Sequence, residues 1–391
     1  MDNFTFYSPT YFVFGKEEEK QAGSLVKKFG GSKVLIHYGG GSVVRSGLLD
    51  RVKASLTESG IEFVELGGVK PNPRSGLVYE GIELARKEKV DFILAVGGGS
   101  TIDSSKAIAA GVLYDGDFWD YYNGKHVEEA LPVGTVLTIA AAGSEGSSSS
   151  VITKEEGMLK RGTNSDAIRP KFSILNPELT ETLPPYQTAS GATDIIAHLY
   201  ERYLTNTKEV QTTDRLIEAL ITAMVEETPK VMKDPHDYDA RANIMWAGMM
   251  AHNNSVGVGR SQDWNSHGLE HELSATYDCA HGAGLAVTMP AVFEYTMNHD
   301  VMRFAQIATR VWGVPMNEAH PEETALAGIR ALRDFLTSIG MPVSIKEFGA
   351  KEEDIPMLAH TCCYSNGRDG KRYGFTVLDE NDVIAIYKKM L

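Results

Sequence analysis

The pattern of the chain changes once, at Leu183-Pro184-Pro185. Before this point, short apolar runs alternate with segments whose apolar residues have helical spacing. After it, long helical patterns follow one another and strand patterns nearly vanish. Proline donates no backbone hydrogen bond and disfavours helix at the residue before it, so a Pro-Pro pair is a plausible boundary. For a chain of 391 residues, we therefore predict two domains, residues 1–184 and 185–391.

The first domain has the alternation of an α/β fold. Such alternation is typical of a parallel sheet covered by helices on both faces. Its strands are predicted at 33–38, 61–66, 90–96 and 131–140, and its helices at 46–59, 75–89 and 101–111. The second domain is predicted to be all-α, with helices at 187–204, 212–232, 239–256, 301–312, 322–339 and 381–390.

The charge and the cysteines narrow the class of protein. A formal net charge of −14 argues against nucleic acid or an anionic membrane surface as a partner. No secretory signal pattern is present, and no apolar run reaches the roughly 18 residues that a membrane helix needs. The three cysteines, Cys279, Cys362 and Cys363, do not form a disulfide framework. We therefore expect a cytoplasmic protein.

The turn Gly97-Gly98-Gly99-Ser100 follows a predicted buried strand and opens a helix. Glycines let a phosphate group approach the backbone, and the helix N-terminus offers free N–H groups and a positive dipole end. Ser100, with Asp103 three residues later, resembles an N-cap pair. The turn matches neither Gly-x-Gly-x-x-Gly nor the P-loop pattern, so a tight turn without a ligand is an equal alternative.

An earlier turn, Gly39-Gly40-Gly41-Ser42, ends another predicted strand. A dinucleotide lies across such strand ends in an open sheet, so this turn is a candidate for the adenosine side. It has no acidic residue to bind a ribose 2′-hydroxyl, and Arg45 is close by, which favours NADP over NAD. The segment 137–145, with its small and hydroxyl residues, is a candidate for lining the nicotinamide or the ribose. A plain turn or loop is the alternative in both places.

Candidate metal ligands follow in the second half. Asp194 and His198 are four residues apart in a predicted helix, so their side chains point to the same side. His267 and His271 repeat this spacing, and His281 follows. Three protein ligands with an open position suit a catalytic Zn²⁺, while three imidazoles with a carboxylate equally suit Fe²⁺ or Mn²⁺. From spacing alone, a metal site and a set of structural histidines are equal alternatives.

At these residues the chain resembles the iron-containing (group III) alcohol dehydrogenase family, and within it the butanol dehydrogenases and NADP-linked aldehyde reductases. The resemblance runs from Phe4 through at least Ala286. The shared motifs include Phe14-Gly15, Tyr38 to Ser42, Pro71-Asn72-Pro73, Gly97 to Ser100 with Asp103 and Lys106, Gly143-Ser144-Glu145, Leu183-Pro184-Pro185, Asp194-x-x-x-His198, Tyr238 to Asn243, and the segment with His267, His271 and His281. Their number and order are more specific than any one motif.

The resemblance implies a metal centre and a nicotinamide cofactor. The implied metal is Fe²⁺, with Zn²⁺ as the alternative, and its ligands are Asp194, His198, His267 and His281. The pyrophosphate is assigned to Gly97, Gly98, Gly99 and Ser100, and the nicotinamide half to Asp103, Thr138 and Ser144. The remaining cofactor contacts are assigned to Gly39, Gly40, Gly41, Ser42 and Asn72, where glycine in place of an acid implies NADP, with NAD as the alternative.

The same resemblance implies the reaction. We predict a metal-dependent oxidoreductase for a short- to medium-chain aldehyde or primary alcohol, active as a homodimer, with its site in the cleft between the domains. The predicted catalytic residues are His271, as a proton relay, Asp103 and Lys160. One departure is Asn176, which stands where the family generally has an acidic residue before proline.

Two other classes of function stay open. A polyol dehydrogenase or a sugar-phosphate cyclase on the same scaffold usually binds metal with a carboxylate and two histidines. His198, four residues after Asp194, favours an alcohol dehydrogenase instead. The third reading is a metal- or nucleotide-binding module without catalysis, which absence of NADPH oxidation across a panel of aldehydes would favour.

Overall fold

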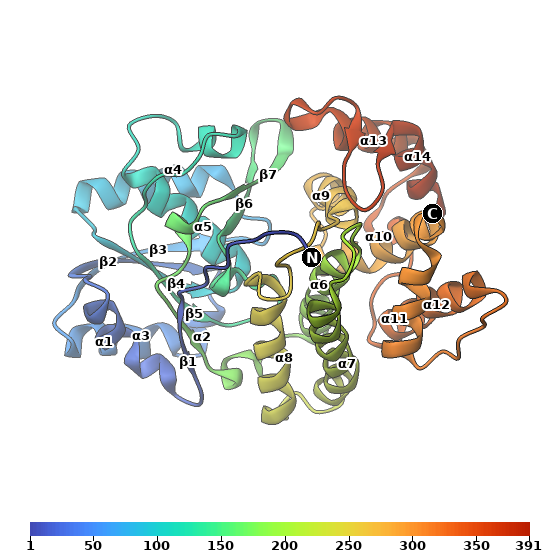
Figure 1. Cartoon of the computed structure of the whole chain (residues 1–391). Coiled ribbons are helices and arrows are strands. Elements are labelled where there is room, and N and C mark those ends of the chain that lie inside the picture. Colours follow the sequence, from blue (N-terminus) through green and yellow to red (C-terminus); the bar gives the residue numbers. More distant parts are fainter. The chain divides into compact units, whose positions relative to one another are not determined.

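The computed structural model describes residues 1–391, except for the side chain of Asn366. The chain forms two compact units. One runs from Tyr7 to Leu183, and the other joins Met1–Phe6 to Pro184–Leu391. The first unit contains the large sheet and the second is mainly helical (Figure 1). The predicted order, an α/β part followed by a helical part, is therefore confirmed.

Six parallel strands form the sheet of the first unit, in the order β1-β8-β5-β4-β2-β3. The strands are β1 (Tyr11–Phe14), β2 (Lys33–Gly39), β3 (Glu62–Val69), β4 (Phe92–Gly97), β5 (Val133–Leu137) and β8 (Phe172–Leu175). The predicted strands correspond to β2, β3, β4 and β5. Neither β1 nor β8 has a counterpart in the prediction, nor has the antiparallel pair β6 (Ser149–Lys154) and β7 (Leu159–Asn164).

Helices cover both faces of this sheet because neighbouring residues of each strand point to opposite sides. Leu35 and Ile93 pack toward α4 and α5, whereas Val34 and Leu94 pack toward α1 and α3. Helix α2 follows β2 directly. The bounds of these helices are α1 (Ala22–Lys28), α2 (Ser42–Arg45), α3 (Leu48–Glu58), α4 (Ser75–Glu88) and α5 (Gly99–Val112).

The strand order reverses between β2 and β4, which are neighbours in the sheet. Both strands end in a glycine-rich turn, Gly39-Gly40-Gly41 after β2 and Gly97-Gly98-Gly99 after β4. In open α/β sheets, ligands bind outside the carboxyl ends of the strands at such a reversal. The topology thus brings the two glycine turns to the position where a nucleotide is expected.

Among the described residues, the second unit contains nine α-helices. They are α6 (Pro185–Tyr203), α7 (Gln211–Lys233), α8 (Tyr238–His252), α9 (Asn265–Tyr277), α10 (His281–Thr296), α11 (Val301–Trp312), α12 (Pro321–Ser338), α13 (Ile355–Tyr364) and α14 (Glu380–Lys389). A short antiparallel pair, β9 (Lys371–Arg372) and β10 (Leu378–Asp379), departs from the all-α prediction. Across the described residues, no helix is long and apolar enough to span a membrane.

Helix α6 is the central element of this unit. It packs against α7, α8, α9 and α10, and every residue from Thr188 to Tyr203 is buried. Charged side chains are rarely fully buried unless they are paired. Nevertheless, α6 carries Asp194, His198, Glu201 and Arg202 in its interior stretch. Such a concentration of polar groups inside a core marks this helix as a place to look for a site.

Candidate functional site

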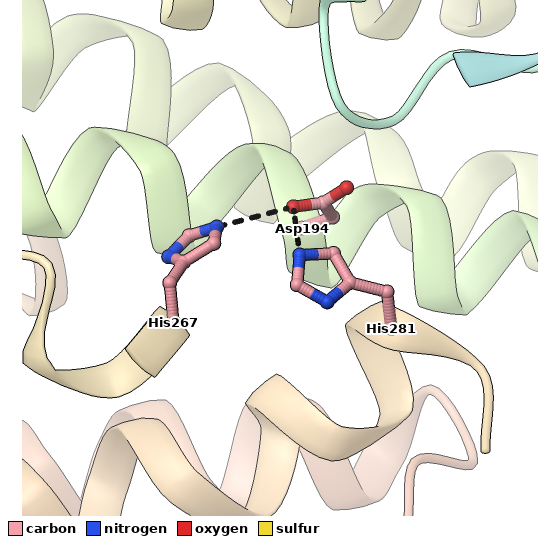
Figure 2. Close-up of side chains that lie close together, drawn as sticks. All are labelled: Asp194, His267 and His281. Carbon is pink, nitrogen blue, oxygen red and sulfur yellow. Dashed lines mark ion pairs between the residues drawn. The ribbon is translucent and has the colours of Figure 1, made fainter. Parts of the chain in front are cut away.

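Asp194, His267 and His281 converge from three helices (Figure 2). The Asp194 Oδ1 atom lies 3.7 Å from His267 Nε2 and 3.8 Å from His281 Nε2. One ligand atom from each residue lies within 4.8 Å of the others. Asp194 and His267 are buried, and His281 is partly exposed. Side chains of this type at this spacing can share one divalent ion.

Two atoms of this group have unmet hydrogen-bonding capacity. In the described part of the chain, nothing forms a hydrogen bond with Asp194 Oδ1 or His267 Nε2, although both are shielded from solvent. A buried polar atom without a partner is costly, and native proteins rarely retain one. A divalent cation bound between the two atoms would satisfy both. The residues present therefore fit a metal ion.

In the metal-free group, the same side chains pair a carboxylate anion with an imidazolium, whose proton a bound cation would replace. Burial alone would raise the pKa of Asp194, but the charges of His198 and His281 and the close contacts with the His198 and His267 rings hold it well below its ordinary range. Burial would lower the pKa of His267, but the charge of Glu201 and contacts with Asp194 raise it to about 9. The site therefore favours a carboxylate anion facing positive charge.

His198 occupies a different position from the other two histidines. Its Nδ1 donates to the backbone carbonyl of Asp194 at 2.8 Å and lies 3.0 Å from Asp194 Oδ1. Its ring centroid is 4.4 Å from that of His267. The structure thus brings His198 against the group, but not into the trio whose ligand atoms lie within 4.8 Å. Its role as a fourth ligand stays a prediction.

Two residues that the sequence analysis does not single out contact these histidines. Glu201 Oε2 pairs with His267 Nδ1, and Glu270 Oε2 pairs with His281 Nδ1. The sequence contains a spacing that could have drawn attention to both glutamates. Glu201 comes three residues after His198 and Glu270 three residues after His267, a spacing that puts two side chains on one helix face.

His271 lies one turn after His267 on α9 and is half-buried. Its ring centroid is 5.5 Å from that of His281 and 6.3 Å from that of His267. It also forms a second group of ligand-type atoms with Glu270 and His281. The structure therefore places His271 beside the predicted metal ligands, and its relay role stays a prediction.

In the first unit, the turn after β4 differs in one detail from the prediction. Helix α5 begins at Gly99, and its N-cap residue Gly98 provides no side-chain hydrogen bond, so the predicted Ser100–Asp103 N-cap pair is wrong. The carboxylate of Asp103 instead accepts from Ser144 Oγ at 2.5 Å and from the Val151 backbone N–H at 2.9 Å. Without a side-chain cap, the first N–H groups of α5 are available to another acceptor.

The other predicted cofactor residues of this unit form two small groups. The Thr138 backbone N–H donates to the Gly97 carbonyl at 3.1 Å, which places Thr138 and Ser144 at the same strand end as the glycine turn. Lys160 Nζ donates to Asn72 Oδ1 at 3.0 Å. Neither contact tests whether these residues bind a cofactor or take part in catalysis, so both assignments stay predictions.

Packing explains the glycines at two positions without a ligand. A Cβ atom at Gly97 would lie 2.5 Å from Thr101 Oγ1, and one at Gly98 would lie 2.2 Å from Ile139 Cγ2. At Gly41, the backbone has a φ of 117°, which favours glycine. Gly40 has open space instead, with nothing within 4 Å of an added Cβ. Gly40 is therefore a glycine at which the protein's own packing would admit a side chain.

Lys106 has a role in this unit that its place in the motif does not reveal. Its side chain is fully buried, and Nζ donates to the carbonyls of Ser144, Ser147 and Ser149 at 2.7, 3.0 and 2.8 Å. Burial lowers the pKa of Lys106 to about 8, and the negative charge of Asp103 opposes this shift. The ammonium group thus fixes the course of the segment that carries Ser144.

Asn176, the residue that departs from the family pattern, acts locally. Its side-chain oxygen accepts from the Glu178 backbone N–H at 3.1 Å and caps the 3-10 helix Pro177–Thr180. Its amide nitrogen donates to Glu19 Oε2 at 2.9 Å. An acidic residue here would face the Glu19 carboxylate, so the amide suits this particular neighbour.

Comparison with known proteins identifies the family. The family model of the iron-containing alcohol dehydrogenases matches residues 9–177, and that of the C-terminal part of the Fe-containing alcohol dehydrogenase family matches residues 188–391. The chain belongs to the iron-containing alcohol dehydrogenase family. The resemblance seen in the sequence is confirmed, and with it the expected class of enzyme, an oxidoreductase of the alcohol dehydrogenase type.

Individual relatives cover the whole chain. It is 42% identical to the probable NADH-dependent butanol dehydrogenase 2 of Bacillus subtilis, over 100% of both chains. It is 36% identical to an NADPH-dependent aldehyde reductase of Escherichia coli, over 99% of this chain and 97% of the relative. The crystal structure of NADH-dependent butanol dehydrogenase A from Thermotoga maritima superposes with a TM-score of 0.96 at 40% identity, over 100% of this chain and 99% of that one.

The bond network around Lys106 leads to a first prediction. Lys106→Met leaves three buried carbonyls without their donor and should lower the free energy of unfolding by about 3 kcal/mol. The measurement is urea denaturation. Lys171→Met, which changes an exposed lysine of the same unit, should leave the midpoint unchanged. Equal midpoints for the two variants would contradict the role given to Lys106.

Proposed function

We propose that this chain is a metal-dependent alcohol dehydrogenase that transfers hydride between NADP(H) and a short- to medium-chain aldehyde or primary alcohol. Family membership supports the class of reaction. The names of the butanol dehydrogenase and aldehyde reductase relatives support the class of substrate. The observation that carries the proposal is the convergence of Asp194, His267 and His281, with two buried ligand atoms that no hydrogen bond satisfies.

We assign Asp194, His198, His267 and His281 as the metal ligands, with Fe²⁺ as the expected metal and Zn²⁺ as the alternative. When bound, such an ion supplies Lewis-acid polarisation of the substrate oxygen. Asp194 contributes the negative charge from the middle of a buried helix. The histidines contribute nitrogen atoms whose direction is set by their hydrogen bonds through Nδ1.

We assign His271 the role of proton relay between the substrate oxygen and solvent. An imidazole can both accept and donate a proton, which a relay requires. His271 has the right neighbours for this role, because it lies beside His281 and His267 and is outside the group that these two histidines form with Asp194. Asp103 and Lys160 belong to the sheet unit, and their assignment rests on the family pattern alone.

We place the nicotinamide cofactor at the turns after β4 and β2. The uncapped start of α5 offers backbone N–H groups for the pyrophosphate, and Asp103, Thr138 and Ser144 follow at the nicotinamide side. The relatives include both NADH- and NADPH-dependent enzymes. We favour NADP because Arg45 Nη1 would lie 3.3 Å from a Cβ at Gly41, beside the predicted adenosine ribose.

We further propose a cytoplasmic homodimer. All three cysteines are buried and, among the described residues, none forms a disulfide, which suits a reducing compartment. Strand β1 lies at the edge of the sheet and exposes Tyr11 and Phe14. An exposed apolar edge strand has unpaired backbone groups that can bind another chain, and a second copy of this chain would cover it.

The metal assignment gives the principal test. His267→Ala should lose its bound metal and reduce kcat by roughly 10³-fold, because several kcal/mol of transition-state stabilisation go with the metal. The measurements are metal content per chain and the rate of NADPH oxidation with butanal. His320→Ala, at an exposed position, serves as the matched control. A His267→Ala protein with its full metal content and full rate would refute the assignment.

The coenzyme assignment gives a separate test. Arg45→Ala should lower kcat/KM for NADPH roughly 10-fold and leave kcat/KM for NADH nearly unchanged, because a charged hydrogen bond to the 2′-phosphate is lost. Initial rates with both coenzymes on the same aldehyde measure this ratio. Arg51→Ala changes an arginine that instead pairs with Glu19 and is the control. Equal losses with both coenzymes would contradict a 2′-phosphate contact.

A further inference from the structure

We infer that Glu201 and Glu270 are positioning residues of the metal centre, each orienting one histidine ligand through its Nδ1 atom. The inference rests on the proposed function, since it concerns the same metal. Both side chains are fully buried. Neither belongs to the predicted ligand set, and each reaches a histidine on another helix or at the start of the next one.

Glu201 contacts His267 through both carboxylate oxygens. Oε2 pairs with the imidazole Nδ1, and Oε1 accepts from the His267 backbone N–H at 3.1 Å. His267 lies in the first turn of α9, whose N-cap residue Trp264 provides no side-chain hydrogen bond. The carboxylate therefore satisfies a free N–H at the positive end of the helix and turns the ring at the same time. It fixes both the backbone and the side chain of this ligand.

Glu270 performs the corresponding task for His281, the first residue of α10. Its Oε2 pairs with His281 Nδ1. The space for its side chain is provided by Gly284 of α10, where a Cβ atom would lie 2.7 Å from Glu270 Cγ. A side chain at position 284 would displace the carboxylate. The glycine is thus independent support for a place shaped around Glu270.

For both His267 and His281, the carboxylate at Nδ1 determines which ring nitrogen is available to a metal ion. In the neutral ring that a metal ion requires, Nδ1–H donates to the carboxylate and the lone pair lies on Nε2, the atom that faces Asp194 Oδ1 at 3.7 or 3.8 Å. A carboxylate partner also makes the imidazole a stronger ligand. His198 Nδ1 instead contacts Asp194 itself, through the backbone carbonyl at 2.8 Å and the carboxylate Oδ1 at 3.0 Å. The centre therefore contains two histidines oriented by carboxylates outside the ligand set and one oriented by Asp194.

The carboxylates that orient the histidines follow the order of the helices along the chain. Helix α6 supplies Asp194, His198 and Glu201, and Glu201 orients the histidine of α9. Helix α9 supplies His267 and Glu270, and Glu270 orients the histidine at the start of α10. Each histidine outside α6 is therefore set by a carboxylate on the preceding helix of the site. The geometry of the centre is fixed by contacts between the helices and does not depend on the ligands alone.

The test compares Glu201→Gln and Glu270→Gln with the unaltered full-length chain. Affinity for Zn²⁺ is measured by competition with a chelator, and the visible absorption of the Co²⁺-loaded protein reports the ligand geometry. We expect roughly 10–100-fold weaker Zn²⁺ binding in each variant, with a shifted Co²⁺ band at saturation. Glu201→Gln should also lower the urea midpoint of the metal-free protein, because the amide cannot accept both hydrogen bonds at once.

Glu218→Gln is the matched control. Glu218 is a buried carboxylate of α7 that accepts from Tyr203 and pairs with Arg310, so its loss should affect stability without affecting metal affinity. Unaltered Zn²⁺ affinity and an unaltered Co²⁺ spectrum in Glu201→Gln and Glu270→Gln would overturn the inference. If Glu201→Gln does not fold, the Glu270→Gln result decides alone. A wild-type chain that binds neither Zn²⁺ nor Co²⁺ would overturn the proposed function as well.

Discussion

The charge on Asp194 is the constraint on which the helical unit depends. This carboxylate lies in the middle of α6, where all residues from Thr188 to Tyr203 are buried. An ionised group in such a place is expensive unless positive charge or hydrogen bonds compensate for it. Its surroundings nevertheless hold its pKa well below the ordinary range, through His198, His281 and His267. The imidazoles of three helices are therefore arranged around one buried anion, and this arrangement is what a divalent metal needs.

In the sheet unit, the important feature is the shape of the backbone at the carboxyl ends of two strands, where glycines stand in place of larger side chains. Strand reversal between β2 and β4 brings two glycine turns together. The buried ammonium group of Lys106 donates hydrogen bonds to the carbonyls of Ser144, Ser147 and Ser149. The uncapped start of α5 and the fixed course of the segment around Ser144 suit a bound coenzyme. In both units, buried charge determines the local structure at the proposed site.

Much of this fold follows from sequence patterns, and the exceptions have physical reasons. Strands β2 to β5 are apolar runs next to clear helices, so the pattern predicts them. By contrast, β1 and β8 have four residues each, and they pair with each other over a long sequence separation. Helix α10 contains Gly282, Gly284 and Pro290 and is buried nearly all round, so it has no amphipathic stripe to recognise.

In the candidate site, too, some contacts can be predicted from the sequence and others cannot. The spacing of Asp194 and His198, or of His267 and His271, is readable because both members of each pair lie on one helix. The contacts of Glu201 with His267 and of Glu270 with His281 cross from one helix to another. Spacing shows which residues share a helix face, but it does not show which helix lies opposite. The N-cap assigned to Ser100 and Asp103 failed for a related reason, because Asp103 finds better partners in Ser144 and Val151.

The central claim is that one metal ion is bound where Asp194, His267 and His281 converge. Anomalous diffraction at the metal absorption edge, from crystals of the Zn²⁺- or Fe²⁺-loaded protein, tests it most directly. We expect a single strong peak at roughly 2.0–2.2 Å from the Asp194 carboxylate and from Nε2 of both histidines. A fully loaded protein with its peak elsewhere, or with no peak at these three residues, would contradict it.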